Sequence, residues 1–357
     1  MDDTTTHHPL QGLTFLWLEI TAKCNLECIH CYADSGPHQS LLGQMKTEDW
    51  LRVMHDAAHI ECQQVQFIGG EPTLHPDLPQ MISFASSLNY RFIEVFTNAV
   101  TINDNLLQIF VKYGVHIATS FYSDNPKIHD MITKHQGSFT RTVRGIKRVL
   151  AAGLPIRVGI IEMKENSGHA LKAKRFLENI GVSQIKIDSQ RGVGRGMRSV
   201  HLLNPMAELC GECWKGKLCV TSSGKAYPCV FSRFVDLGDV KNGIHSITSN
   251  NGLSSFRASY REFCLKQGLS DCFVMESISV GSDKDSSFSS NTLDDLSLNP
   301  CIPNRVCAPA CQPTCSPCPP VSFCAPMSEP CSPDRSCNPT SRPCSPDRSC
   351  NPSIELG

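Results

Sequence analysis

Short apolar runs alternate with amphipathic stretches over the first half of the chain. The apolar runs are typical of buried strands, and they occupy residues 13–20, 64–70, 91–98, 115–121, 155–161 and 183–188. Stretches with helical periodicity separate them, at residues 47–59, 78–88, 103–114, 139–153 and 167–181. Apolar strands that alternate with helices of about a dozen residues predict a parallel sheet covered by helices.

Six such strand–helix steps, with no dinucleotide-binding glycine fingerprint after the first strand, favour an open α/β barrel over a flat doubly wound sheet. In barrels of parallel strands, the chemistry sits where strands end and loops begin. Chemically active residues occupy those places here. They are Cys24 after the first strand, Gly69 to Pro72 after the second, Thr97 and Asn98 at the end of the third, and Ser120 at the end of the fourth.

The bulk composition removes several classes of partner. The 357-residue chain carries 33 basic and 34 acidic residues, so its formal net charge of −1 gives no electrostatic basis for binding nucleic acid or a membrane surface. No apolar run reaches transmembrane length, and the N-terminal stretch MDDTTTHHPLQG lacks a signal-peptide core. We therefore expect a cytoplasmic enzyme with no nucleic-acid or membrane partner.

Twenty cysteines are too many for an average chain of this length, and they divide evenly. Ten lie before residue 280 and ten lie between residues 301 and 350. In a long chain without a signal sequence, metal or cluster ligation is a better interpretation than a disulfide framework.

The first cysteines, Cys24, Cys28 and Cys31, have the spacing Cys-x3-Cys-x2-Cys. Three thiolates on a cubic iron–sulfur cluster leave one of its four irons without a protein ligand, and such an open position distinguishes a catalytic metal site from a structural one. The alternative interpretation is a stripe of small core residues, because positions i, i+4 and i+7 share one face of a helix.

Through these motifs the chain resembles the radical S-adenosylmethionine (SAM) enzymes, and the resemblance covers residues 12–235. Their Cys-x3-Cys-x2-Cys motif follows the first strand of a (β/α)6 partial TIM barrel, and their Gly-Gly-Glu-Pro motif is intact at Gly69 to Pro72. The position before the last cysteine is usually aromatic in that family, and here it is His30. The resemblance implies a [4Fe-4S] cluster on the three cysteines, which accepts one electron from a flavodoxin- or ferredoxin-type donor. It also implies reductive cleavage of SAM to a 5′-deoxyadenosyl radical that abstracts hydrogen from a substrate.

The same resemblance assigns cofactor-binding residues beyond the cysteines. It implies that Gly69 and Gly70 let the backbone approach the methionine end of SAM and that Glu71, followed by Pro72, receives its ammonium group. The list of cofactor-binding positions is completed by His30, Asn98 and Ser120. Ordinary strand-end hydrogen bonding is the alternative for the last two residues.

One expected contact departs from the family pattern. Relatives often carry an arginine after the fourth strand to hold the methionine carboxylate, whereas this chain has Thr133 and Lys134 there. Arg191 and Arg195 follow the last strand, and they either serve that carboxylate or face solvent.

A second set of cysteines, Cys210-x2-Cys213-x5-Cys219-x9-Cys229, surrounds a predicted β-hairpin with a Ser-Gly turn. It resembles the auxiliary-cluster extension of radical SAM enzymes, called SPASM or, in its shorter form, twitch. We expect one auxiliary [4Fe-4S] cluster on these four residues, with Cys219 as the fourth ligand; a structural zinc is the alternative. Cys264 and Cys272 look isolated, and Cys62 is expected in the core.

The C-terminal tail follows one rule: each of its ten cysteines has a proline two residues later. Proline at this density disfavours helix and sheet, so we expect a disordered, partly extended tail. Three interpretations stay open: an inert low-complexity segment, a metal- or cluster-handling arm, and a fused peptide substrate.

Together these patterns predict four regions. They are a radical SAM partial barrel at 12–198, a SPASM/twitch-like region at 199–275, a Ser-rich linker at 276–300 and the Cys-x-Pro tail at 301–357. The expected function is radical modification of a ribosomally synthesised peptide. Maturation of a small cofactor, such as a porphyrin or molybdopterin-type precursor, is the alternative within enzymes. A non-catalytic zinc-binding scaffold is the alternative outside them.

Overall fold

Six parallel strands form the centre of the computed structural model, which describes residues 12–199, 204–209, 213 and 216–267. The strands are β1 (Phe15–Thr21), β2 (Gln64–Gly69), β3 (Phe92–Phe96), β4 (His116–Phe121), β5 (Ile156–Glu162) and β6 (Gln184–Ser189). Each pairs in parallel with the next along the chain, in the spatial order β6-β5-β4-β3-β2-β1. This confirms the six predicted strands, whose boundaries differ by one or two residues from those expected.

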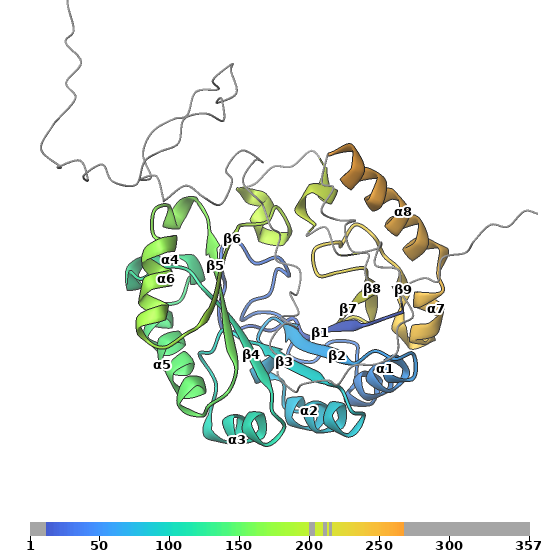
Figure 1. Cartoon of the computed structure of the whole chain (residues 1–357), viewed down its shortest axis with the longest axis horizontal. Coiled ribbons are helices and arrows are strands. Elements are labelled where there is room, and N and C mark those ends of the chain that lie inside the picture. Colours follow the sequence, from blue (N-terminus) through green and yellow to red (C-terminus); the bar gives the residue numbers. More distant parts are fainter. Residues whose placement is uncertain (1–11, 200–203, 210–212, 214–215, 268–357) are drawn as a thin grey trace, which may run out of the picture. The chain divides into compact units, whose positions relative to one another are not determined.

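Helices connect the strands and lie along one side of the sheet (Figure 1). They are α1 (Thr47–His59), α2 (Leu78–Ser87), α3 (Asp104–Lys112), α4 (Pro126–Thr133), α5 (Ser138–Ala151) and α6 (Ala170–Asn179). The pattern of apolar positions did not predict α4. Its start carries a local signal nonetheless, because Asn125 caps it by accepting a hydrogen bond from the Lys127 N–H and proline occupies the first turn.

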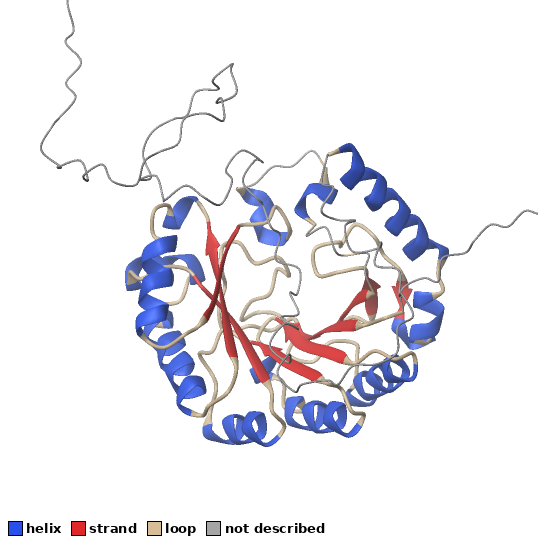
Figure 2. Cartoon of the chain, viewed as in Figure 1, coloured by secondary structure: helices blue, strands red, loops and turns tan. Residues whose placement is uncertain are grey.

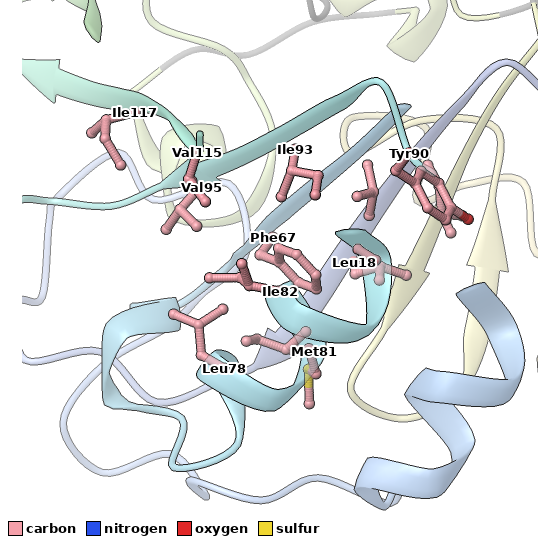
Figure 3. Packing of buried hydrophobic residues seen from close by; sticks show 14 of the residues in the cluster. Leu18, Phe67, Leu78, Met81, Ile82, Tyr90, Ile93, Val95, Val115 and Ile117 are labelled. Atoms are coloured by element: carbon pink, nitrogen blue, oxygen red, sulfur yellow. The ribbon is translucent and has the colours of Figure 1, made fainter. Parts of the chain in front are cut away.

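Alternate residues of each strand serve different faces of the sheet. In β1, Leu16, Leu18 and Ile20 pack with the helices in the main core, and the same core holds Phe67 of β2 with Met81 of α2 (Figure 3). The other face of the strands carries large aromatic and polar side chains, and it lines a cavity. Because side chains alternate with period two, the helix-covered face anchors the sheet and the opposite face is available for chemistry.

The predicted hairpin extends this sheet beyond β1. Strand β7 (Lys217–Thr221) pairs in parallel with β1, and β8 (Lys225–Tyr227) and β9 (Gly238–Asp239) follow in antiparallel pairing (Figure 2). The turn between β7 and β8 uses Gly224 at φ +84°, a conformation that favours glycine. Two further helices, α7 (Ile244–Thr248) and α8 (Asn251–Lys266), were not predicted.

The predicted linker and tail lie outside the described residues, and the boundaries of the four predicted regions stay predictions. In the part of the chain that the structure describes, no helix combines the length and the apolar character that a membrane crossing requires.

Candidate functional site

One cavity at the carboxyl ends of the parallel strands brings together most of the predicted site. Its wall includes the three cysteines of the first motif. It also includes five of the predicted cofactor residues, namely His30, Gly69, Gly70, Asn98 and Ser120. These residues come from three strand ends and the loop after β1, so the topology of parallel strands explains why residues far apart in sequence meet here.

The three cysteines face the cavity without converging on one point. The Sγ of Cys24 lies 3.4 Å from the Leu26 amide nitrogen and 3.7 Å from Nδ2 of Asn98. The Sγ of Cys28 lies 4.0 Å from the Tyr122 hydroxyl. Within the described ranges, no three His, Cys, Asp or Glu side chains are placed to hold a single metal ion.

Solvent exclusion dominates the electrostatics of the three thiols. It raises the pKa of Cys28 to about 12 and also raises the pKa values of Cys24 and Cys31. The positive charge of Arg195 opposes the rise for Cys28 and Cys31. Buried thiols of this kind become stable thiolates when a cationic centre binds them, and the donor set therefore fits an iron–sulfur cluster.

The Gly-Gly-Glu-Pro motif fixes the start of the cysteine loop, which we define as residues 24–36. The Gly70 N–H donates to the Thr21 carbonyl at 2.7 Å, and the Glu71 N–H donates to the Lys23 carbonyl at 2.8 Å. A Cβ on Gly70 would lie 2.1 Å from the Lys23 carbonyl oxygen, and Gly69 has φ +137°. Glycine is required at both positions because the backbone of β2 touches that of β1.

The expected contact of Glu71 with the ammonium group of SAM stays a prediction, and the structure shows where Glu71 and Pro72 lie. Neither lines the cavity, and Glu71 is fully buried. Its carboxylate accepts hydrogen bonds from the Thr73 amide and hydroxyl, the Thr97 hydroxyl and the Asn98 amide. Burial raises the pKa of Glu71, and these four donors oppose the rise. In this geometry Glu71 joins the end of β2 to the end of β3.

His30 lines the cavity and has one buried ring nitrogen without a hydrogen-bond partner among the described residues. Its ring packs edge-on against Tyr122 at 5.0 Å, and its buried Nδ1 has no hydrogen-bond partner within the described chain. Burial and the nearby Arg195 charge lower the pKa of His30 to about 4, so the imidazole is neutral at pH 7. A neutral ring with a spare polar atom suits contact with a nucleotide base better than contact with an anion.

Helix α4 supports the cysteine loop from another side. The amides of Glu27 and Ile29 donate to the carbonyls of Thr133 and Ile132 at 3.1 and 3.0 Å. Thr133 is buried and lines the cavity, whereas the exposed Lys134 ends the helix in a left-handed conformation. The Thr133 hydroxyl is hydrogen-bonded to the His129 carbonyl and to the Ser138 hydroxyl, so the position that usually carries an arginine brings no charge to the cavity.

The two arginines that were expected either to serve the carboxylate or to face solvent do not face solvent. Arg191 and Arg195 both line the cavity, and Arg195 is only 8% exposed. They are the cationic residues after β6 that could meet a carboxylate in this cavity.

A polar network on the inner face of the sheet was missed in the sequence. Glu94 is buried and accepts two hydrogen bonds from Arg157, at 2.7 and 2.8 Å, and it also accepts one from Gln66. Arg157 lies over the Phe96 ring at 5.5 Å from the centroid. Gln66, Phe96 and Arg157 line the cavity. The sequence signal that could have revealed this network is the occurrence of polar residues at alternate positions of otherwise apolar strands.

The second cysteine set forms a buried cluster in the described region. Cys213, Cys219 and Cys229 are 0% exposed and belong to one apolar cluster, which also contains Cys264 of α8. Cys264 is therefore not isolated, because the unpredicted helix α8 brings it back to the hairpin. Cys210 and Cys272 lie outside the described residues. Cys62 is buried in the main core, as expected.

Comparisons with known proteins agree with this geometry. Residues 18–177 match the family model described as Radical SAM superfamily. The PqqA peptide cyclase of Granulibacter bethesdensis is 25% identical over 205 residues, covering 57% of this chain and 54% of the cyclase. A probable GTP 3′,8-cyclase of Saccharolobus islandicus is 26% identical over 189 residues, covering 53% of this chain and 59% of that protein. The chain thus spans about half the length of the curated relatives it matches.

Solved structures show the same fold. Streptococcus suis SuiB bound to S-adenosylmethionine has a TM-score of 0.51 at 16% identity, over 61% of this chain and 60% of SuiB. SuiB bound to its precursor peptide SuiA has a TM-score of 0.52 at 15% identity, over 62% of this chain and 60% of SuiB. The partial-barrel fold expected from the sequence is confirmed by this likeness.

Proposed function

Because the chain contains a radical SAM domain, we propose that it is an enzyme that holds a [4Fe-4S] cluster on Cys24, Cys28 and Cys31 and cleaves S-adenosylmethionine reductively. The observation that carries the proposal is the common cavity of the three thiols and the predicted SAM-binding strand ends. The bound cluster supplies one electron, from a flavodoxin- or ferredoxin-type donor, to generate a 5′-deoxyadenosyl radical.

The protein's own residues bind, orient and shield. The backbone at Gly69 and Gly70 lets the methionine end of SAM approach β2, and Asn98 and Ser120 offer polar side chains at the ends of β3 and β4. Arg191 supplies the cation for the methionine carboxylate that the Thr133 position lacks. His30 contributes its spare nitrogen on the same wall. Large side chains on the inner face of the sheet, Trp17 and Phe96 among them, would shield the reactive carbon from water.

For the substrate, we propose a ribosomally synthesised peptide. The support is similarity: one relative is named a peptide cyclase, and SuiB has been solved with a precursor peptide. A small cofactor precursor is the second candidate, and the match to a probable GTP 3′,8-cyclase favours it. Incubating the loaded enzyme and SAM with synthetic precursor peptides separates the two, because peptide modification changes peptide mass by the hydrogens removed.

We assign the second cysteine set to one auxiliary [4Fe-4S] cluster. Cys213, Cys219 and Cys229 are its described ligands, and Cys210 and Cys264 compete for the remaining place. A structural zinc on these residues would instead favour a non-catalytic scaffold. Iron, sulfide and zinc analysis after anaerobic reconstitution distinguishes an iron–sulfur cluster on these cysteines from a structural zinc.

The deciding experiment is reductive SAM cleavage by the anaerobically reconstituted chain. Wild-type protein should form 5′-deoxyadenosine, and Cys28→Ala should not, because one of three ligands is lost. Cys62→Ala is the matched control, since Cys62 is a buried thiol of the core outside the cavity. Cleavage by Cys28→Ala at the rate of the Cys62→Ala control would overturn the proposal.

A further inference from the structure

A short segment after β6 reaches back across the cysteine loop. It contains η3 (Gly194–Arg198), a 3-10 turn, and its central residue is Arg195. Arg195 donates Nε–H to the Cys28 carbonyl at 2.8 Å and Nη2–H to the Ser35 carbonyl at 2.6 Å. Its backbone N–H donates to the Cys31 carbonyl at 2.9 Å. One residue thus ties three carbonyls of a loop that lies about 160 positions earlier in the chain.

Glycines on both sides of Arg195 permit this close approach. Gly194 has φ +58°, and a Cβ there would lie 2.4 Å from the Tyr32 carbonyl oxygen and 2.5 Å from that of Cys31. A Cβ on Gly196 would lie 2.0 Å from the Arg191 carbonyl oxygen. A side chain at Gly194 would push the segment away from the loop, and one at Gly196 would collide with the backbone of the segment itself, so the Gly-Arg-Gly sequence is a packing requirement.

The other end of this segment is anchored. Arg191 donates to the Glu208 carbonyl at 2.9 Å, and the Gly192 N–H donates to the Glu208 carboxylate at 2.9 Å. Arg191 also pairs with Asp188 at 3.1 Å. Because Glu208 is buried, these contacts hold residues 191–196 as a fixed strap over the cysteine loop.

The strap carries a charge that no carboxylate neutralises in the described region. The guanidinium of Arg195 donates to neutral carbonyls, and none of the ion pairs between described residues includes it. It is 8% exposed, so water screens it little. Its hydrogen bond to the Cys28 carbonyl places this charge beside two of the three cysteines.

We propose that Arg195 is a positioning residue with two roles, and the proposal rests on the proposed function. It holds the cysteine loop in its ligand-ready shape before iron arrives. It also fixes a positive charge next to Cys28 and Cys31, which favours uptake of an electron by the cluster they hold.

The first role is tested on the full-length protein without iron. Amide hydrogen exchange across residues 24–36 should be about tenfold faster in Arg195→Gln and in Arg195→Lys, because neither side chain reproduces the two N–H bonds of the guanidinium. Arg198→Gln is the matched control, since this exposed arginine lies in the same turn. Exchange in both Arg195 variants equal to that of Arg198→Gln would overturn this role. If Arg195→Gln unfolds, Arg195→Lys alone decides in the same way.

The second role is tested by potentiometric titration of the loaded protein, followed by electron paramagnetic resonance. The reductant is titanium(III) citrate, and each Ti(III) gives one electron to the cluster and becomes Ti(IV). Arg195→Gln should weaken reduction of the cluster about tenfold, a shift of about 59 mV to lower potential for one electron. Arg195→Lys should stay close to wild type because it keeps the charge. Equal potentials in Arg195→Gln and Arg198→Gln would overturn this role.

The two tests separate failure of the strap from failure of the proposed function. If wild-type protein binds no iron–sulfur cluster, the proposed function fails and with it the electrostatic role. The exchange experiment still decides the positioning role, because it needs no iron.

Discussion

The two cysteine sites of this chain differ in how they meet their surroundings. Cys24, Cys28 and Cys31 lie in one loop, held by backbone hydrogen bonds, and all three line the cavity. Cys213, Cys219, Cys229 and Cys264 come from a hairpin region and a distant helix, are 0% exposed, and do not line it. On the proposed function, the same ligand type would serve an open, reactive site in one place and a closed site in the other.

The largest effect that tests this contrast is loss of a ligand at the open site. Cys24→Ala should lower 5′-deoxyadenosine formation at least ~1000-fold, because a missing thiolate removes the cluster that the reaction needs. The melting temperature of the iron-free protein should change little. Rates are measured by chromatography of the product under strict anaerobiosis. Turnover within tenfold of wild type would remove the distinction between the sites.

Loss of a cysteine at the closed site should instead affect stability and iron content more than SAM cleavage. Cys264→Ala should lower the melting temperature of the loaded protein and reduce its iron content, because Cys264 is buried with the other cysteines of that cluster. SAM cleavage should remain within about tenfold of wild type. Iron content and melting temperature equal to those of wild type would exclude Cys264 as a ligand and leave Cys210 for that place.

A third prediction concerns the glycine that lets the loop sit against β2. Gly70→Ala should destabilise the fold by about 1–3 kcal/mol, because the new Cβ would meet the Lys23 carbonyl oxygen and backbone must move. The measurement is urea unfolding of the iron-free chain. Gly159→Ala in β5 is the control, since a Cβ there meets nothing within 4 Å. Equal midpoints for the two variants would contradict the proposed contact.

The last predicted effect is a pH dependence beside the open site, which appears only below pH 6.5. Burial lowers the pKa of His129 to about 4, against about 6.5 when unfolded. Above pH 6.5 the His129 ring is neutral in both the folded and the unfolded state. As the pH falls from 6.5 toward 4, the unfolded state takes up the proton first, so the free energy of unfolding decreases. The loss from this residue should reach about 3 kcal/mol.

Urea unfolding of the iron-free protein between pH 7 and pH 4.5 measures this dependence. His129→Gln should flatten the slope, because the titrating group is gone. An exposed histidine offers the control: His245→Gln should leave the slope unchanged, since His245 is more accessible to solvent. A slope in His129→Gln as steep as in that control would contradict the assignment.

The cysteines of the open site and most of its proposed cofactor residues could be predicted from the sequence, because they lie in short local motifs or at strand ends. Cys24, Cys28 and Cys31 sit in one loop, and the strand ends at Gly69 and Ser120 follow from the periodicity of the strands. What the sequence could not reveal depends on distant contacts. The hydrogen bonds of Arg195 join positions 167 and 160 residues apart, and no local pattern encodes them.

The closed site also depends on distant contacts that local sequence patterns do not reveal. Cys264 looked isolated because α8 was not predicted, and its place beside the hairpin depends on how that helix packs. Glu71 shows what a motif leaves open. A motif does not reveal the local partners of a carboxylate, and here they are Thr73, Thr97 and Asn98; the expected contact with the SAM ammonium stays a prediction.

The central claim is that the three cysteines hold a cluster with one iron open to SAM. Mössbauer spectroscopy of ⁵⁷Fe-loaded protein tests it most directly, in a Cys264→Ala background that simplifies the closed site. Adding SAM should change the signal of one of the four irons held by Cys24, Cys28 and Cys31 and leave the other three unaltered. Four irons that all ignore SAM, or zinc bound in their place, would contradict it.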